Sequence, residues 1–188
     1  MEATNTGIPN RKLAMWTFLG SECMLFGSLI ATFLIYRGRN IVGPYPEELL
    51  NIPFITVTTF VLLMSSLAMV LALSAVQRDD RRMTQVWLLM TAVFGLIFLG
   101  GQYYEFSHFV HEGLPLGQNL FSSSFYVLTG THGAHVAGGV IWLLTLFALA
   151  VTGRLKSTDA LNVEIAGLYW HFVDAVWIVL FTVIYLLE

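Results

Sequence analysis

Five long apolar stretches fill most of this 188-residue chain and leave little sequence for any other structure. They cover residues 13–36, 52–76, 84–104, 120–152 and 165–187. Each reaches the roughly 20 residues that a helix, rising about 1.5 Å per residue, needs to cross about 30 Å of hydrocarbon. The stretches predict an all-α fold, an integral membrane bundle of five transmembrane helices, with residues 1–188 forming a single transmembrane domain.

Composition supports the membrane assignment and excludes several other classes of protein. The chain is 56% hydrophobic and 11% charged, whereas soluble domains average roughly a quarter charged residues. Cys23 is the only cysteine and lies within the first stretch, which excludes an internal disulfide or a thiolate cluster built from this chain alone. Residues 1–10 contain no basic segment followed by a cleavage site, so residues 13–36 are expected to be a retained span and not a signal peptide.

The breaks between the spans are residues 38–53, 77–83, 105–119 and 153–164, which contain Gly, Pro or clustered charge. They place Glu105, His108, His111 and Glu112 at or beyond the end of the third span, where the two histidines are expected to be solvated. Glu164 falls at the end of the last break.

Lysine and arginine are distributed unevenly among these breaks. Arg37 and Arg39 lie between the first and second spans, and the third break has neither residue type. The other seven lie before the first span or in the second and fourth breaks: Arg11, Lys12, Arg78, Arg81, Arg82, Arg154 and Lys156. Because short cytoplasmic loops are enriched in basic residues, the sequence predicts a cytoplasmic N-terminus and a C-terminus outside.

Ionisable side chains inside three of the spans are the candidate functional residues. Glu22 lies in the first span, His132 and His135 in the fourth, and His171 and Asp174 in the fifth. Such a group costs several kcal/mol at bilayer depth unless it is neutralised or paired, so it is a functional candidate by default.

His132 and His135 lie three residues apart among small residues of the fourth span. Two interpretations are open: close helix packing with a polar network, or a metal-binding pair on one helix face. We favour packing because a metal site needs more ligands, and the remaining histidines are His108, His111 and His171. That number is also too small for the histidine-rich boxes of membrane desaturases.

In the fifth span, His171 and Asp174 share a helix face, and Glu164 lies two turns earlier. A carboxylate beside an imidazole could form a proton relay or orient a metal ligand. We favour a buried pair that satisfies its own hydrogen bonds, because nothing adjacent supplies a nucleophile or a redox group. For Glu22, the sequence leaves open a proton acceptor or an acid bonded to a neighbouring helix or a lipid headgroup.

Four motifs, in their order along the chain, resemble subunit III of the haem–copper terminal oxidases. They are residues 18–22 (FLGSE), 102–106 (QYYEF), 130–136 (GTHGAHV) and 162–177 (NVEIAGLYWHFVDAVW). The last is the most specific, and the resemblance extends over nearly the whole chain.

The resemblance implies a non-catalytic subunit of a proton-pumping respiratory oxidase, which stabilises the catalytic subunit, binds phospholipid and supports proton uptake in aerobic electron transport. No active site, haem or copper is expected in this chain. Haem and copper are expected in the partners, which are the catalytic subunit I, subunit II and a small subunit IV; no nucleic acid is expected to bind. The same analogy makes six residues structural and lipid- or proton-associated positions, none of them catalytic, cofactor-binding or metal-binding: Glu22, His132, His135, Glu164, His171 and Asp174.

The resemblance also implies a short, five-helix form that belongs in a prokaryotic plasma membrane. Seven-helix members carry two further N-terminal spans, which flank a lipid-binding cleft, and this chain begins where their third span would. A lipid site built on that pair would need its helices from another subunit. The family serves cytochrome c and quinol oxidases, and Glu22, Glu164 and the Tyr169-Trp170 form favour the cytochrome c branch.

Three alternative functions are compatible with parts of the sequence. The first is subunit III of a quinol oxidase. The second is a stand-alone membrane metalloenzyme with His132, His135 and His171 as ligands beside Asp174 and Glu22, since imidazole binds zinc and copper well. The third is a small transporter, for which the glycine-rich part of the fourth span is the one hint of a broken helix.

Overall fold

The computed structural model describes residues 7–37 and 52–187. Five long helices make up this part of the chain, and each is long and apolar enough to cross a membrane, which confirms the predicted all-α architecture. They are α1 (Asn10–Arg37), α3 (Ile52–Gln77), α4 (Arg81–His111), α5 (Leu120–Val151) and α6 (Ala160–Phe181). A 3₁₀ turn, η1 (Ser157–Asp159), precedes α6, and a π-helical turn, η2 (Thr182–Leu186), continues it.

Two predicted helix boundaries were wrong, and in both cases the observed helix is longer than the predicted one. α4 continues to His111, so Glu105, His108 and His111 are helical and not part of a loop. α6 begins at Ala160, so Glu164 is also helical. In both cases the apolar run is shorter than the helix, because a helix can include polar residues at its ends. α4 continues through them almost to Gly113, whose φ of 81° is not helical. Arg39 and most of the first predicted break, residues 38–51, lie outside the described residues.

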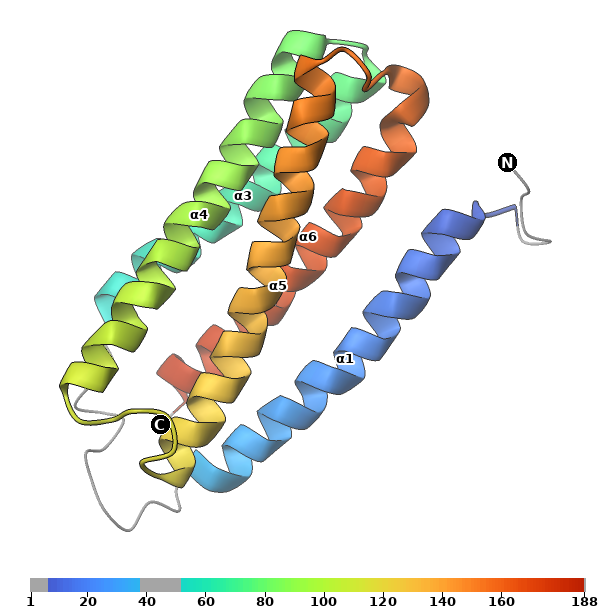
Figure 1. The fold of residues 1–188 in the computed structure, drawn as a ribbon. Helices are drawn as coiled ribbons and strands as arrows, with labels where there is room; N and C mark the ends of the chain where they lie inside the picture. Colours follow the sequence, from blue (N-terminus) through green and yellow to red (C-terminus); the bar gives the residue numbers. More distant parts are fainter. Residues whose placement is uncertain (1–6, 38–51, 188) are drawn as a thin grey trace.

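Four of the helices form a bundle, and the fifth lies along its outside (Figure 1). α3 packs against α4 and α6, and α5 packs against the same two helices, so the four close a ring. α1 packs against α5 and α6. Only 17% of the residues in the most apolar 18-residue segment of α1 are buried, compared with 50% in the corresponding segment of the last span. α1 is therefore the least enclosed of the five helices.

Trp170 of α6 fills the centre of the four-helix bundle and is 2% exposed. A Cβ atom at Gly95 of α4 would lie 2.7 Å from the Trp170 ring, and one at Gly139 of α5 would lie 2.8 Å from it. The indole Nε1 donates a hydrogen bond to Ser65 Oγ of α3 at 2.8 Å. Small residues let membrane helices approach closely, and here they make room for one indole that contacts three neighbouring helices.

Arginine side chains close two helix ends whose last carbonyl groups have no partner within the helix. Arg81 of α4 donates to the Ala150 carbonyl oxygen at 3.0 Å and to that of Val151, at the end of α5. Arg37 of α1 donates to the Val183 carbonyl oxygen at 2.9 Å and to that of Leu187, at the end of η2. A cation near a helix C-terminus is favourable, so these contacts attach neighbouring helices to each other at their ends.

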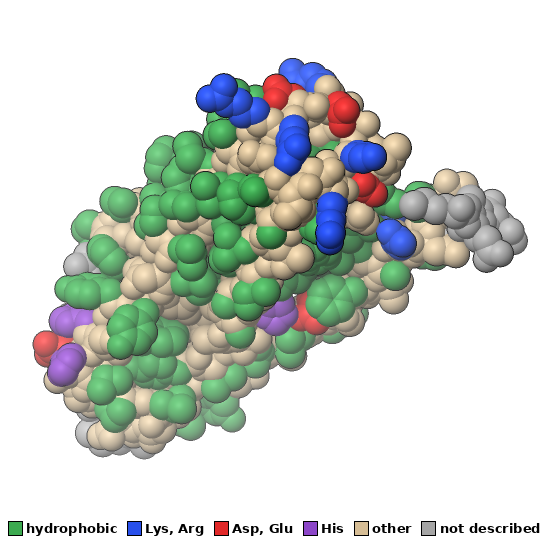
Figure 2. All heavy atoms as spheres, turned by 45° about the horizontal axis from the view of Figure 1, so that its top comes forward, with side chains coloured by type: hydrophobic (Ala, Val, Ile, Leu, Met, Phe, Trp, Pro, Cys, Tyr) green, Lys and Arg blue, Asp and Glu red, His purple; other side chains and the backbone are tan. Residues whose placement is uncertain are grey.

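Basic side chains gather at one end of the bundle (Figure 2). This end holds the start of α1 and the α3–α4 and α5–α6 turns, as Figure 1 shows. The seven residues predicted to face the cytoplasm are the ones found in these three places: Arg11, Lys12, Arg78, Arg81, Arg82, Arg154 and Lys156. Among the described residues, Arg37 is the cation at the opposite end.

Candidate functional site

Glu22 and His135 form a pair that connects α1 to α5. Their side chains are 13% and 18% exposed, and His135 Nε2 lies 3.0 Å from Glu22 Oε2. The other imidazole nitrogen, Nδ1, lies 2.8 Å from the Thr131 carbonyl oxygen. The structure therefore gives Glu22 the neighbouring-helix partner that was one of the two open interpretations.

The hydrogen bonds of His135 define the charge of this pair. A carbonyl oxygen only accepts, so Nδ1 carries a proton and donates to Thr131. A hydrogen bond between Nε2 and Glu22 Oε2 requires one further proton, which belongs either to an imidazolium or to a carboxylic acid. In both arrangements the pair is neutral overall, which removes most of the cost of placing two ionisable groups inside a membrane.

His132 points away from this pair, into the four-helix bundle. It is fully buried, and its Nε2 lies 3.2 Å from the Val173 carbonyl oxygen of α6. Aromatic rings surround it, with the Phe98 centroid at 5.7 Å and the Trp177 centroid at 4.8 Å. The two histidines thus bind different partners, His135 on α1 and His132 on α6. Within residues 7–37 and 52–187, no group of three or more His, Cys, Asp and Glu side chains could hold a metal ion.

His171 and Asp174 meet through a serine of α3 that the sequence analysis did not single out. Ser66 Oγ donates to Asp174 Oδ2 at 2.6 Å, and His171 Nδ1 lies 3.2 Å from the same Oγ atom. Glu164 does not join them: it accepts a hydrogen bond from Lys12 Nζ of α1 at 2.5 Å, near the basic end of the bundle.

Glu105 and Tyr185 form a further buried pair, which sequence reasoning missed. Glu105 is 6% exposed, and the Tyr185 hydroxyl lies 2.8 and 2.9 Å from its two carboxylate oxygens. The carboxylate was expected at the membrane surface, where a hydrophobicity boundary placed it. The signal that could have found the pair is the helical phase of α4, in which Glu105 follows the buried Gly101 by four residues.

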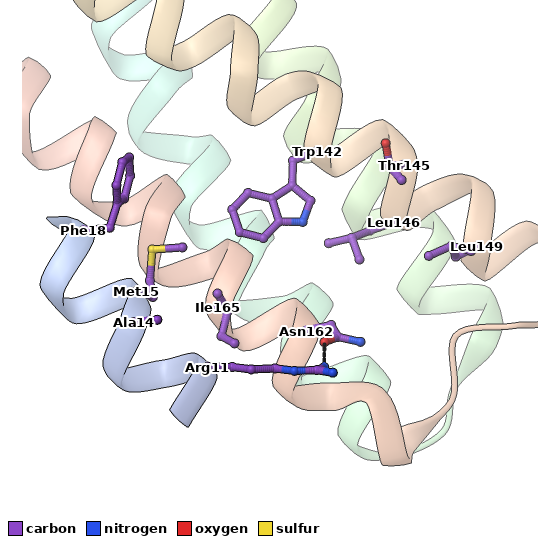
Figure 3. Close-up of a pocket in the computed structure, with 10 residues that line it drawn as sticks. All are labelled: Arg11, Ala14, Met15, Phe18, Trp142, Thr145, Leu146, Leu149, Asn162 and Ile165. Atoms are coloured by element: carbon purple, nitrogen blue, oxygen red, sulfur yellow. Dashed lines mark hydrogen bonds between the residues drawn. The ribbon is translucent and has the colours of Figure 1, made fainter. Parts of the chain in front are cut away.

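A lateral groove of about 580 Å³ opens between α1 and the α5–α6 pair, near the basic end. Figure 3 shows Trp142 of α5 and Phe18 and Met15 of α1 around it, with Arg11 reaching Asn162 at its end. The Arg11 guanidinium donates to Asn162 Oδ1 at 3.2 Å. The remaining residues that line the groove are apolar apart from Thr145: Ala14, Leu146, Leu149 and Ile165. An apolar groove with one cation at its end has the chemistry of a lipid-binding surface.

Comparison with known proteins adds a family to this geometry. A family profile described as Cytochrome c oxidase subunit III matches residues 3–188. Cytochrome c oxidase subunit 3 of Bacillus sp. (strain PS3) is 43% identical over 178 residues, which are 95% of this chain and 86% of the relative. Probable quinol oxidase subunit 3 of Staphylococcus saprophyticus is 38% identical over 177 residues, 94% of this chain and 88% of that protein.

Proposed function

Because this chain belongs to the cytochrome c oxidase subunit III family, we propose that it is the non-catalytic subunit III of a haem–copper respiratory oxidase. It is a multi-pass protein of a prokaryotic plasma membrane, with five spanning helices. Its partners are the catalytic subunit I, subunit II and a small subunit IV. The haem and copper lie in partner subunits, and this chain carries no active site of its own.

The observation that carries this proposal is the family match over residues 3–188. The polar geometry supports it. Glu22, Glu105 and Glu164 each bond to a side chain of another helix, so these carboxylates attach helices to one another. Groups engaged in this way stabilise a bundle, and none is positioned with a second ligand and an open coordination site as a metalloenzyme requires.

Deleting this chain is expected to leave the haem spectrum of the oxidase largely intact while turnover becomes slower or stops sooner. The reason is that the haem ligands lie in other subunits, whereas this chain stabilises them. Membranes from the deletion strain and from a complemented strain would be compared by difference spectroscopy and by oxygen consumption during sustained turnover. Loss of all haem signal from a stable, fully assembled subunit I would contradict the proposal.

The same preparation tests the electron donor, which we propose to be cytochrome c. The relative from Bacillus sp. (strain PS3) supports this choice, at 43% identity compared with 38% for the quinol oxidase relative. The complex purified through a tag on this chain would be supplied with reduced cytochrome c or with a quinol. Faster oxygen consumption with quinol would reassign it to the quinol branch.

The basic end of the bundle faces the cytoplasm in our proposal, which places the C-terminus outside. The clustering of seven basic residues at that end, opposite Arg37, supports this orientation under the positive-inside rule. Alkaline phosphatase fused to the C-terminus is expected to be active, and the same enzyme inserted after Asp79 in the α3–α4 turn is expected to be inactive. A C-terminal green fluorescent protein that fluoresces while the phosphatase fusion stays inactive would contradict the orientation.

The lateral groove binds an anionic phospholipid in this proposal. An acyl chain would lie along Phe18, Trp142 and Leu146, and Arg11 at the end of the groove would contact the phosphate. The acyl chain would pack against the apolar lining of the groove. A cation near the membrane surface contributes about 1 kcal/mol to the binding of an anionic headgroup. All the residues that line this groove belong to α1, α5 and α6 of this protein.

Arg11→Gln is expected to reduce the phosphatidylglycerol that copurifies with the complex by about fivefold, the equivalent of about 1 kcal/mol. Bound lipid would be measured by extraction and mass spectrometry after exchange into phosphatidylcholine nanodiscs. Arg154→Gln is the matched control, because Arg154 is an exposed cation at the same end that does not line the groove. An equal loss in both variants would indicate a general charge effect and no site.

A further inference from the structure

A short polar chain crosses the contact between α3 and α6. Ser66 gives its only hydroxyl hydrogen to Asp174 Oδ2, at 2.6 Å. Its oxygen then accepts from His171 Nδ1, at 3.2 Å, so Nδ1 of this imidazole carries a proton. A neutral imidazole with a proton on Nδ1 has a free lone pair on Nε2 and is a hydrogen-bond acceptor there.

This polar chain lies near the middle of the membrane. Ser66 is fourteen residues from the start of α3 and eleven from its end, which correspond to about 21 and 17 Å along the helix axis. His171 is eleven residues from the start of α6, or about 17 Å. Lipid headgroups and water lie at the two membrane surfaces, so neither reaches this depth without disturbing the bilayer.

Two polar atoms of the hydrogen-bonded group Ser66, Asp174 and His171 have no hydrogen-bond partner in the described part of the molecule. His171 Nε2 makes no hydrogen bond there, and His171 is half-buried. Asp174 is 6% exposed, and its Oδ1 is buried without a hydrogen-bond partner. An unsatisfied polar group in hydrocarbon costs several kcal/mol. Within the Glu22–His135 pair and within the Glu105–Tyr185 pair, the two side chains bond to each other. His171, by contrast, is partly exposed on the outside of the bundle.

Beside His171 and Ser66, exposed apolar residues lie at this depth on the described parts of α3 and α6. Residues three, four and seven positions from Ser66 and His171 share their helix faces. Val70 of α3 is 52% exposed and Ile178 of α6 is 45% exposed. We call this surface the seam face, and it consists of Leu63, Ser66, Val70, His171, Ala175 and Ile178. It is an apolar strip along two helices with one unpaired imidazole near its centre.

We propose that the seam face is the docking surface for a transmembrane helix of a neighbouring oxidase subunit, which donates a hydrogen bond to His171 Nε2. Acyl chains have no hydrogen-bond donor, and a headgroup donor lies about 17 Å away, so lipid does not satisfy the imidazole. A helix that presents Ser, Thr, Asn, Gln or Trp at this depth does, and membrane helices associate through such contacts. The inference rests on the proposed function, because that function supplies the neighbouring subunits.

Site-specific photo-crosslinking tests this docking surface in the intact complex. Val70 or Ala175 would be replaced by benzoylphenylalanine, and Leu96, which is 50% exposed near the middle of α4, is the matched control. Irradiated membranes would be solubilised, and adducts of the tagged chain identified by mass spectrometry. We expect both seam positions to yield an adduct with another oxidase subunit, at several times the yield found at Leu96.

The outcomes separate this inference from the function on which it rests. Haem that copurifies while the seam positions give only lipid adducts, or adducts with a second copy of this chain, would overturn the docking surface and leave the function in place. A tagged chain that brings no haem from its native membrane would overturn both.

A second measurement addresses the hydrogen bond itself. His171→Leu is expected to lower the amount of other subunits retained by about three- to eighteenfold during a detergent titration, because an interhelical hydrogen bond in a membrane contributes about 0.6–1.7 kcal/mol. His171→Gln keeps an acceptor and is expected to restore most of the loss. Unchanged retention in His171→Leu would overturn the proposed contact.

Discussion

Gly95→Ala is expected to lower the stability of the four-helix bundle by about 1–3 kcal/mol, the usual cost of overpacking a close-packed core. The added Cβ would lie 2.7 Å from Trp170 Cη2 and 2.8 Å from Val140 Cγ2. The indole has little room to move away, because other atoms of its ring lie against Gly139 and its Nε1 donates to Ser65. Gly139→Ala is expected to have an effect of similar size, for the same reason.

Gly100→Ala is the matched control in the same helix. An added Cβ at Gly100 meets no atom within 4 Å, and replacing glycine by alanine favours a helix by about 1 kcal/mol. Each variant would be purified in its complex, and the temperature at which this chain unfolds or dissociates would be recorded. If Gly95→Ala and Gly100→Ala gave the same transition temperature, the tight packing around Trp170 would be refuted.

A double variant tests whether the stability lost in Gly95→Ala comes from contact between the added Cβ atom and the Trp170 ring. Trp170→Phe shortens the side chain and removes the ring atoms nearest to Gly95, at the cost of the hydrogen bond to Ser65. Gly95→Ala combined with Trp170→Phe is therefore expected to lose less stability than the sum of the two single losses. Such non-additivity is the signature of residues in direct contact.

Tyr185→Phe is expected to destabilise the end of the bundle opposite the basic residues by about 1–3 kcal/mol, because it leaves a buried carboxyl group without its hydroxyl donor. Glu105 is 6% exposed, and Tyr185 is 5% exposed. The tyrosine hydroxyl contacts both carboxylate oxygens, and this contact ties η2 to α4. The same transition temperature would be measured as for the glycine variants.

Two further variants test the cause of that loss. Tyr104→Phe removes a hydroxyl from a side chain that is 60% exposed, and it is expected to have almost no effect. Glu105→Met in the Tyr185→Phe background replaces the stranded carboxyl by an apolar group and is expected to recover stability, since removing both partners costs less than removing one. If Tyr185→Phe behaved like Tyr104→Phe, the pair would have no part in holding the bundle together.

The sequence alone determined the architecture and the family. Five runs of apolar residues were sufficient to predict five helices, because a membrane requires long stretches without charge and tolerates few exceptions. The motifs at residues 18–22, 102–106, 130–136 and 162–177 were sufficient for the resemblance to subunit III that the family profile confirms. Helix ends were predicted less well at Glu105 and Glu164, because at both places the helix extends beyond the apolar run.

Only the tertiary structure decided which polar side chains pair. Helical spacing shows which residues share one face of a helix, as with His171 and Asp174, but the partner on another helix depends on how the two helices are rotated and shifted along their axes. Glu22 lies 113 residues from His135 and Lys12 lies 152 residues from Glu164. Sequence spacing carries no information on these pairs. The packing of Trp170 against Gly95 and Gly139, and of α1 against α5 and α6, brings such distant residues together.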